Sequence, residues 1–124
     1  MRLYVWMAAG GALGSLLRYL VDRLFASAPG VFPWGTMAAN IAGCFLLGWF
    51  TSRIIQRKAW PSMWEAVVGT GVIGAFTTFS TFSVETIQLI ENGALFAAGV
   101  YVLVSAAGGL ITAGIGYRAG RRKS

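Results

Sequence analysis

One stretch of the sequence decides the fold, GVIGAFTTFSTFSVE at residues 71–85. It lies within an apolar run over residues 63–90, and five of the seven residues at 77–83 carry hydroxyl groups. The run is longer than the roughly 20 residues with which a helix crosses a bilayer. Ser and Thr hydroxyls compete for backbone hydrogen bonds, and Gly74 tolerates the dihedral angles of a break. The stretch therefore predicts a transmembrane helix that is broken between Gly74 and Thr78.

Three further apolar runs have a length that suits membrane spans, at residues 3–25, 36–55 and 94–117. Of the 124 residues, 56% are hydrophobic and only 11% are charged, which is too little charge for a water-soluble domain. The gaps between the runs hold Pro, Gly and charged residues, as loops do. The sequence thus predicts an all-α integral membrane protein, with four transmembrane helices in a single domain over residues 1–124.

The composition also restricts the chemistry that the chain can perform. It contains no His, a single Cys and four acidic residues, so Ser-His-Asp triads, Cys-His pairs and His-containing zinc sites are excluded. We therefore expect that the protein is not an enzyme. Although the net charge is +6, no basic stripe with interleaved aromatic residues indicates a nucleic-acid partner.

The basic residues are unevenly divided between the two sides of a four-span protein. One side would hold only Arg18 and Arg23. This division favours a cytoplasmic location for both termini by the positive-inside rule. The side with both termini would hold eight: Arg2, Arg53, Arg57, Lys58, Arg118, Arg121, Arg122 and Lys123.

A cleavable signal peptide is the alternative interpretation of the first run. Arg2 precedes the apolar residues, and Ala26-Ser27-Ala28 resembles a cleavage site. Against this, Arg18, Asp22 and Arg23 interrupt the approach to the site, and cleavage would leave three helices.

The broken helix has features that suit ions. Backbone carbonyls that a break releases inside a membrane need a partner, so a cation bound near Gly74 to Thr78 is reasonable. Phe79, Phe82 and Glu85 recur at three-residue spacing on one helical face. Hydroxyl donors beside the positive edges of aromatic rings suit a small anion. Further polar groups that could replace an ion's hydration shell are Asn40, Ser105 and Thr112.

Small residues recur along the predicted helices. The chain has 17 glycines, among them Gly10 and Gly14 in a GxxxG pair. Such residues allow close approach of helices within or between subunits. Because four spans alone make a thin bundle, we expect an oligomer.

Three ordered motifs carry a resemblance to a known family. They are GGALGSLLRY at residues 10–19, GTMAANIAGCFLLG at residues 35–48, and TTFSTFS at residues 77–83. Over nearly its whole length the chain resembles the small bacterial fluoride channels called Fluc or CrcB, and the third motif is the most specific.

The resemblance implies an antiparallel, dual-topology homodimer in the bacterial cytoplasmic (inner) membrane. Such a dimer has two fluoride pores at its interface and a structural sodium ion at its centre, and it exports cytoplasmic fluoride passively, giving fluoride resistance. Its partners would be the fluoride ion, membrane lipid and a second copy of the chain. The residues that match the family's anion pathway are Arg18, Thr36, Asn40, Phe79, Ser80, Thr81, Phe82, Tyr101 and Ser105. Gly74 and Thr77 match its sodium ligands, through their backbone carbonyls.

The sequence departs from the family pattern at two positions. Ala75 stands where a second Gly is common, and Gly109 stands where a further hydroxyl is expected. Glu85 has two interpretations, because an intramembrane carboxylate is functional by default but could pair with a neighbouring donor.

Two other functions remain as alternatives. A proton-coupled small multidrug exporter is also a short four-span protein, but it needs a carboxylate in its first helix, where this chain has no acid before Asp22. A non-conducting assembly subunit would use the small-residue faces and would leave the hydroxyl-rich stretch unexplained.

Overall fold

The computed structural model describes residues 1–25 and 32–122 and is helical, with no strand in these ranges. Three helices are long and continuous: α1 (Arg2–Leu24), α2 (Trp34–Phe50) and α6 (Leu95–Arg121). The predicted all-α class is confirmed. Shorter elements complete the order: η1 (Thr51–Ile55) extends α2 as a π-helix, and α3 (Ser62–Ala66), the π-helix η2 (Val67–Ile73), α4 (Gly74–Phe76) and α5 (Ser80–Glu91) follow one another before α6.

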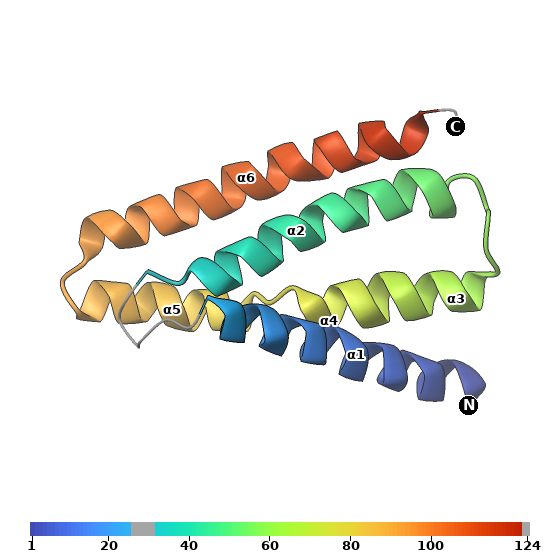
Figure 1. The fold of residues 1–124 in the computed structure, drawn as a ribbon, viewed down its shortest axis with the longest axis horizontal. Coiled ribbons are helices and arrows are strands. Elements are labelled where there is room, and N and C mark those ends of the chain that lie inside the picture. Colours follow the sequence, from blue (N-terminus) through green and yellow to red (C-terminus); the bar gives the residue numbers. More distant parts are fainter. Residues whose placement is uncertain (26–31, 123–124) are drawn as a thin grey trace.

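The helices lie side by side along one long axis (Figure 1). Helix α2 packs most extensively against α6, and α1 packs against η2 and α4. Both termini lie at one end of the molecule, beside the connection between η1 and α3, whereas the turn between α5 and α6 lies at the other end (Figure 1). Residues at the two ends of the sequence therefore meet the middle of the chain at one end of the bundle.

Three helical segments are long and apolar enough to cross a membrane: Trp34–Ile55, Ser62–Glu91 and Leu95–Arg121. They correspond to the runs predicted at residues 36–55, 63–90 and 94–117. The first predicted run is helical as α1, but it is not among these three candidates. Its last turns carry Arg18, Asp22 and Arg23, which lower its hydropathy. The suggested cleavage site at residues 26–28 lies outside the described residues.

Local signals in the sequence set the turns at both ends of the bundle. After α5, Gly93 adopts a left-handed conformation with φ of 77°. Its N–H donates to the Ile90 carbonyl at 3.0 Å, and the Ala94 N–H donates to the Leu89 carbonyl at 2.9 Å. This pair of bonds is the Schellman motif that ends helices at a glycine. At the other end, Pro61 immediately precedes α3, and its carbonyl accepts the first hydrogen bonds of that helix.

Glycines allow the long helices to touch backbone to backbone. A Cβ atom at Gly116 of α6 would collide with the Phe45 carbonyl of α2, and one at Gly14 of α1 would collide with the Val72 carbonyl of η2. Close contact contributes more to helix association in lipid than in water, because the burial of apolar surface does not drive association in lipid. These glycines thus allow α6 to touch α2, and α1 to touch η2, backbone to backbone.

Candidate ion pathway

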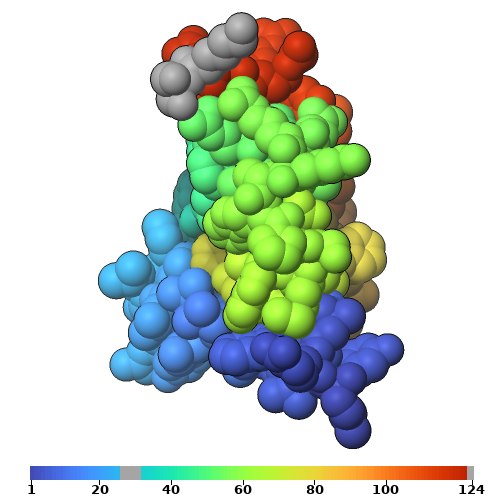
Figure 2. Space-filling view, turned by 90° about the vertical axis from the view of Figure 1, so that its right-hand side faces the viewer, coloured from blue at the N-terminus to red at the C-terminus, as the bar shows by residue number. Residues whose placement is uncertain are grey.

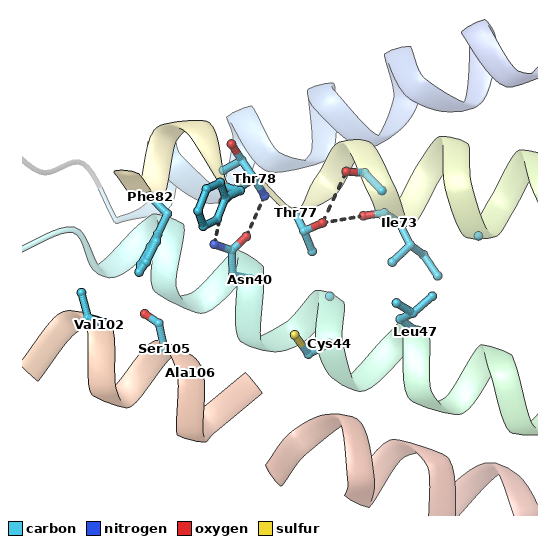
Figure 3. Close-up of a pocket in the computed structure, with 14 residues that line it drawn as sticks. Asn40, Cys44, Leu47, Ile73, Thr77, Thr78, Phe82, Val102, Ser105 and Ala106 are labelled. Atoms are coloured by element: carbon cyan, nitrogen blue, oxygen red, sulfur yellow. Dashed lines mark hydrogen bonds between the residues drawn. The ribbon is translucent and has the colours of Figure 1, made fainter. Parts of the chain in front are cut away.

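Helical structure is interrupted between α4 and α5, within the stretch that opened the sequence analysis. Thr77 is extended, with φ of −85° and ψ of 158°, and helix resumes at Ser80. The side-chain amide of Asn40, on α2, bonds to the interrupted backbone twice (Figure 3). Its Nδ2 donates to the Thr78 carbonyl at 2.9 Å, and its Oδ1 accepts from the Thr78 N–H at 2.8 Å. Asn40 therefore supplies both hydrogen-bond partners that a continuous helix would have given Thr78.

The threonines of the interruption complete the ends of the flanking helices. The Thr78 hydroxyl accepts the Thr81 N–H at 3.1 Å and lies 3.2 Å from the Ser80 hydroxyl, so it caps the first turn of α5. The Thr77 hydroxyl turns back and donates to the carbonyls of Ile73 and Gly74, each at 3.3 Å. The run of hydroxyls thus ends one helix and begins the next.

Two backbone carbonyls at the interruption lose their usual helical donors. In a continuous helix the N–H of Thr78 would bond to the Gly74 carbonyl, and that of Thr81 to the Thr77 carbonyl. Here those N–H groups bond instead to Asn40 Oδ1 and Thr78 Oγ1. The Gly74 and Thr77 carbonyls are the groups that the family resemblance assigns to sodium, and unwound carbonyls are oxygen ligands of the kind that Na⁺ uses in membrane proteins. These carbonyls fit a sodium ion in their chemistry, although that of Gly74 also accepts the Thr77 hydroxyl at 3.3 Å.

A cavity of about 520 Å³ opens beside the interruption. Figure 3 shows that side chains from α2, α5 and α6 surround it. Its lining is mostly apolar, and the described lining residues include no carboxylate and no basic side chain. Of the predicted site residues, six line it: Asn40, Gly74, Thr77, Phe79, Phe82 and Ser105.

Aromatic rings form one side of this region. The ring of Phe82 lies 4.9 Å from that of Tyr101 on α6 and 6.1 Å from that of Phe79, measured between centroids. Tyr101 is fully buried, whereas the Phe79 side chain is 81% exposed in the single chain. Phe82 therefore bridges a buried ring and a ring that projects from the surface of the subunit.

Two hydroxyls on α6 are buried without a hydrogen-bond partner within residues 1–25 and 32–122: Tyr101 OH and Ser105 Oγ. A buried hydroxyl without a partner costs about 1–3 kcal/mol, so native proteins rarely leave one unsatisfied. Ser105 follows Tyr101 by one helical turn, and both belong to the helix that Phe82 faces. The Ser105 hydroxyl is therefore available to a species that is not part of the chain, whereas the Tyr101 hydroxyl lies close to the Thr36 hydroxyl.

A second, smaller cavity of about 130 Å³ lies near the ends of α1 and α2. Its lining includes Thr36, Thr81 and Glu85, which were predicted, and Asp22, whose position sequence reasoning missed. The Thr36 hydroxyl donates to Glu85 Oε1 at 2.5 Å. Glu85 therefore has a neighbouring donor, and it shares its cavity with a second carboxylate. The signal that could have indicated Asp22 is its place in the last turn of the predicted first span.

The remaining predicted residues lie elsewhere. Ser80 contacts the Thr78 hydroxyl at the start of α5. Arg18 lies on α1 and lines neither of these cavities. The Thr112 hydroxyl bonds to the Ile41 carbonyl of α2 at 3.2 Å and to carbonyls of its own helix, so it joins α2 to α6. Gly109, where a hydroxyl was expected, lies against the Cys44 sulfur instead.

These features define a multi-pass membrane protein in which an interrupted helix, neutral donors and aromatic rings surround one cavity. Comparison with known sequences identifies the family. Residues 5–117 match the family described as "CrcB-like protein, Camphor Resistance (CrcB)", and the chain belongs to this family.

Curated relatives from bacteria are similar over most of their length. The chain is 45% identical over 119 residues to "Fluoride-specific ion channel FluC 1" of Bacillus cereus, covering 95% of this chain and 87% of the relative. It is 44% identical over 118 residues to "Fluoride-specific ion channel FluC 2" of Geobacillus kaustophilus, covering 93% and 92%. It is also 46% identical over 105 residues to "Fluoride-specific ion channel FluC 1" of Desulfitobacterium hafniense, covering 85% and 91%. Proteins with these names are ion channels and not enzymes.

Proposed function

We propose that the chain is a fluoride-selective passive channel of the bacterial inner membrane, which exports cytoplasmic fluoride. The names of the relatives support fluoride as the transported ion. The geometry supports an anion pathway through one observation above all, the unpartnered hydroxyl of Ser105, which lines the same cavity as the ring of Phe82. Hydroxyl donors and ring edges are neutral groups that can replace the water around a small anion.

Other donors extend this pathway. The amide of Asn40 has two N–H groups, of which one bonds to the Thr78 carbonyl, and the other is free for an ion. Ser80 and Thr81 begin the first turn of α5, so their hydroxyls prolong the polar line past Phe79 and Phe82. Thr36 lies further along, at the second cavity, and would join the pathway only when its hydroxyl turns from Glu85 to the ion. Arg18 raises the local potential for anions. Fluoride gains more than chloride from short hydrogen bonds to such donors because it is the smaller ion.

The pathway is incomplete in one subunit, and we propose that it is completed in an antiparallel dimer with four membrane spans per chain. In this assembly α1 is the first span, and residues 62–91 form a broken third span. The exposed ring of Phe79 and the open cavity would then face the partner. Two pores result, since each chain contributes to both.

The same dimer would place a structural sodium ion at its centre. The carbonyls of Gly74 and Thr77, which lack their helical donors, would hold it, and the partner's equivalent carbonyls would complete the site. The ion would have a structural role, because it would hold the interrupted helix of one chain against that of its partner.

The charge distribution determines which partner suits this dimer. Seven basic residues of the described chain lie in the elements at the end with both termini, and Arg18 and Arg23 lie in the other half of α1. A homodimer requires half of the chains to insert against this bias, whereas a second chain with the opposite bias would pair without that conflict. Cysteine labelling from either side of the cell membrane decides between them: labelling of a terminal cysteine from both sides supports the homodimer, and labelling from one side requires a second chain.

An efflux assay tests the proposed activity. Purified protein is reconstituted into liposomes loaded with fluoride or chloride, and release is followed with an ion-selective electrode. Rapid loss of fluoride without loss of chloride is expected, and protein-free liposomes are the control. Retention of fluoride would refute the proposal, and equal loss of both ions would refute selectivity.

Two substitutions test whether the rings of Phe79 and Phe82 line the fluoride pathway. Phe82→Ile and Phe79→Ile each remove a ring and keep an apolar side chain, so they should lower fluoride flux while the protein still assembles. Unchanged flux in both variants would show that the rings only pack.

A further inference from the structure

Positive charge gathers at the end of the molecule that contains both termini, which faces the viewer in Figure 2. The contributing residues come from η1, from the turn after it and from the end of α6. Residues 51–64 and 92–124 contain no acid, and the one acid that closely follows the basic residues of η1 and its turn is Glu65 on α3, so the charge of this end stays strongly positive. The basic end, as we call it, consists of Arg53, Arg57, Lys58, Arg118, Arg121 and Arg122.

Hydrogen bonds hold the basic end together. Arg53 Nη1 donates to the Arg122 carbonyl at 3.0 Å, and Arg57 Nη2 donates to the Arg121 carbonyl at 2.9 Å. These guanidinium groups satisfy carbonyls at the C-terminal end of α6 and fix it beside η1. The Tyr117 hydroxyl adds a bond of 2.7 Å to Gln56 Oε1. Basic side chains from two helices are therefore kept close together, although like charges repel.

An apolar hollow lies next to the basic end. Trp60, Pro61, Trp64 and Val68 line a cavity of about 360 Å³, immediately after Arg57 and Lys58 in the chain. Trp60 packs edge-on against Phe50, with ring centroids 5.5 Å apart, which holds the hollow against α2. Indoles prefer the boundary between lipid tails and head groups. Basic residues that are followed directly in the chain by an indole-lined hollow suit a molecule with an anionic head and an apolar body.

We propose that the basic end and the hollow beside it form a binding site for an anionic phospholipid. The phosphate lies on the guanidinium groups of α6 and on Lys58, and the upper part of an acyl chain occupies the hollow between Trp60 and Trp64. Charge complementarity selects this occupant, since basic pockets between helices at the cytoplasmic side bind anionic head groups. The site is independent of fluoride conduction and requires only that the protein lies in a membrane.

Tryptophan quenching by brominated lipid tests the site. The full-length protein is placed in nanodiscs that contain either brominated phosphatidylglycerol or brominated phosphatidylcholine at the same mole fraction. Bromine in an acyl chain quenches indoles within contact distance. Because the chain has five tryptophans, Trp6, Trp34 and Trp49 are first replaced by Phe, so that Trp60 and Trp64 alone report occupation of the hollow. We expect a several-fold higher association constant for phosphatidylglycerol. Equal quenching by the two lipids would overturn the proposal.

Charge variants identify the residues that hold the head group. Lys58→Asn suits the left-handed backbone at that position, where φ is 49°, and Arg118→Gln and Arg121→Gln leave the carbonyl caps of Arg53 and Arg57 in place. Each substitution should lower the preference for phosphatidylglycerol by up to about fivefold. Arg23→Gln, at the other end of α1, should leave it unchanged.

Two further outcomes are decisive. If Arg23→Gln lowers the preference as much as the other variants, general attraction to the membrane surface explains it and the site is refuted. If inorganic phosphate in the buffer abolishes the quenching difference, the basic end binds a soluble anion and not a lipid. Circular dichroism and gel filtration of each variant confirm that its fold is retained. The two lipids are compared in the protein whose only indoles are Trp60 and Trp64.

Discussion

Asn40→Leu should abolish most of the fluoride flux, because the amide of Asn40 holds the interruption between α4 and α5. Leucine has the same branching and the same number of side-chain heavy atoms and is apolar, so the substitution removes the hydrogen bonds and keeps the overall shape. The Thr78 N–H then loses its acceptor, Asn40 Oδ1 at 2.8 Å, and the Thr78 carbonyl loses its donor, Asn40 Nδ2 at 2.9 Å. The backbone at this position has to find other partners.

The two bonds set the size of the effect. Each contributes about 1 kcal/mol net, so their loss costs about 2 kcal/mol, and more if the Thr78 groups stay buried and unpaired. A difference of about 2 kcal/mol changes an equilibrium about 30-fold. The interrupted backbone should therefore lose about that factor in population relative to arrangements in which Thr78 bonds to its own helix. The loss of flux should have a similar size.

Fluoride efflux from liposomes measures the result, and the thermal midpoint of the purified protein measures the stability. Cys44→Ser is the matched control, since Cys44 lies one turn further along α2 and lines the same cavity. It should retain flux within about twofold, as substitutions that remove no specific bond usually do. If Asn40→Leu also keeps its flux and its thermal midpoint, the amide does not maintain the interruption, and the account of the site is wrong.

Three further predictions concern packing, the second cavity and sodium. Gly116→Ala should lower the thermal midpoint, because its Cβ would collide with the Phe45 carbonyl. Gly114→Ala is the control and should leave the midpoint unchanged, since nothing lies within 4 Å of that position. Equal midpoints of the two variants would refute the close contact. Thr36→Val should destabilise the protein by about 1–2 kcal/mol through loss of the bond to Glu85, and Thr36→Ser should restore it, so a stable valine variant would contradict the role of that bond. Replacement of sodium by N-methylglucamine throughout purification should dissociate the dimer on gel filtration, and an unchanged elution volume would argue against a structural sodium ion.

The interruption could be predicted to within a few residues because its determinants are local. The role expected for Gly74 was wrong, since Gly74 is helical with φ of −62° and ψ of −38°, and the chain leaves the helix at Thr77. Ser and Thr side chains act on the backbone within a few residues, as the bonds of Thr77 and Thr78 illustrate. The all-α class followed from composition and run length for the same reason. The family could be identified because its motifs are contiguous and occur in order.

Contacts between distant residues could not be derived from local patterns. Asn40 and Thr78 are 38 positions apart, and their pairing depends on how α2 packs against the interruption. The neighbouring positions of Asp22 and Glu85 at the second cavity likewise depend on the angle between α1 and α5. Thr112 was grouped with the ion-facing polar residues because of its residue type, whereas its bond to the Ile41 carbonyl depends on the contact between α2 and α6.

The groups that line the larger cavity favour passive flow over proton-coupled transport. A coupled carrier needs a group in the pathway that gains and loses a proton in each cycle, and no carboxylate lies among the described lining residues. Glu85 follows Phe82 by three residues but lines the other cavity, where the Thr36 hydroxyl bonds to it. A proton taken up there would have to travel past the ring of Phe82 to influence an ion beside Ser105. Neutral donors impose no such cycle, so the fluoride gradient alone should set the direction and extent of transport.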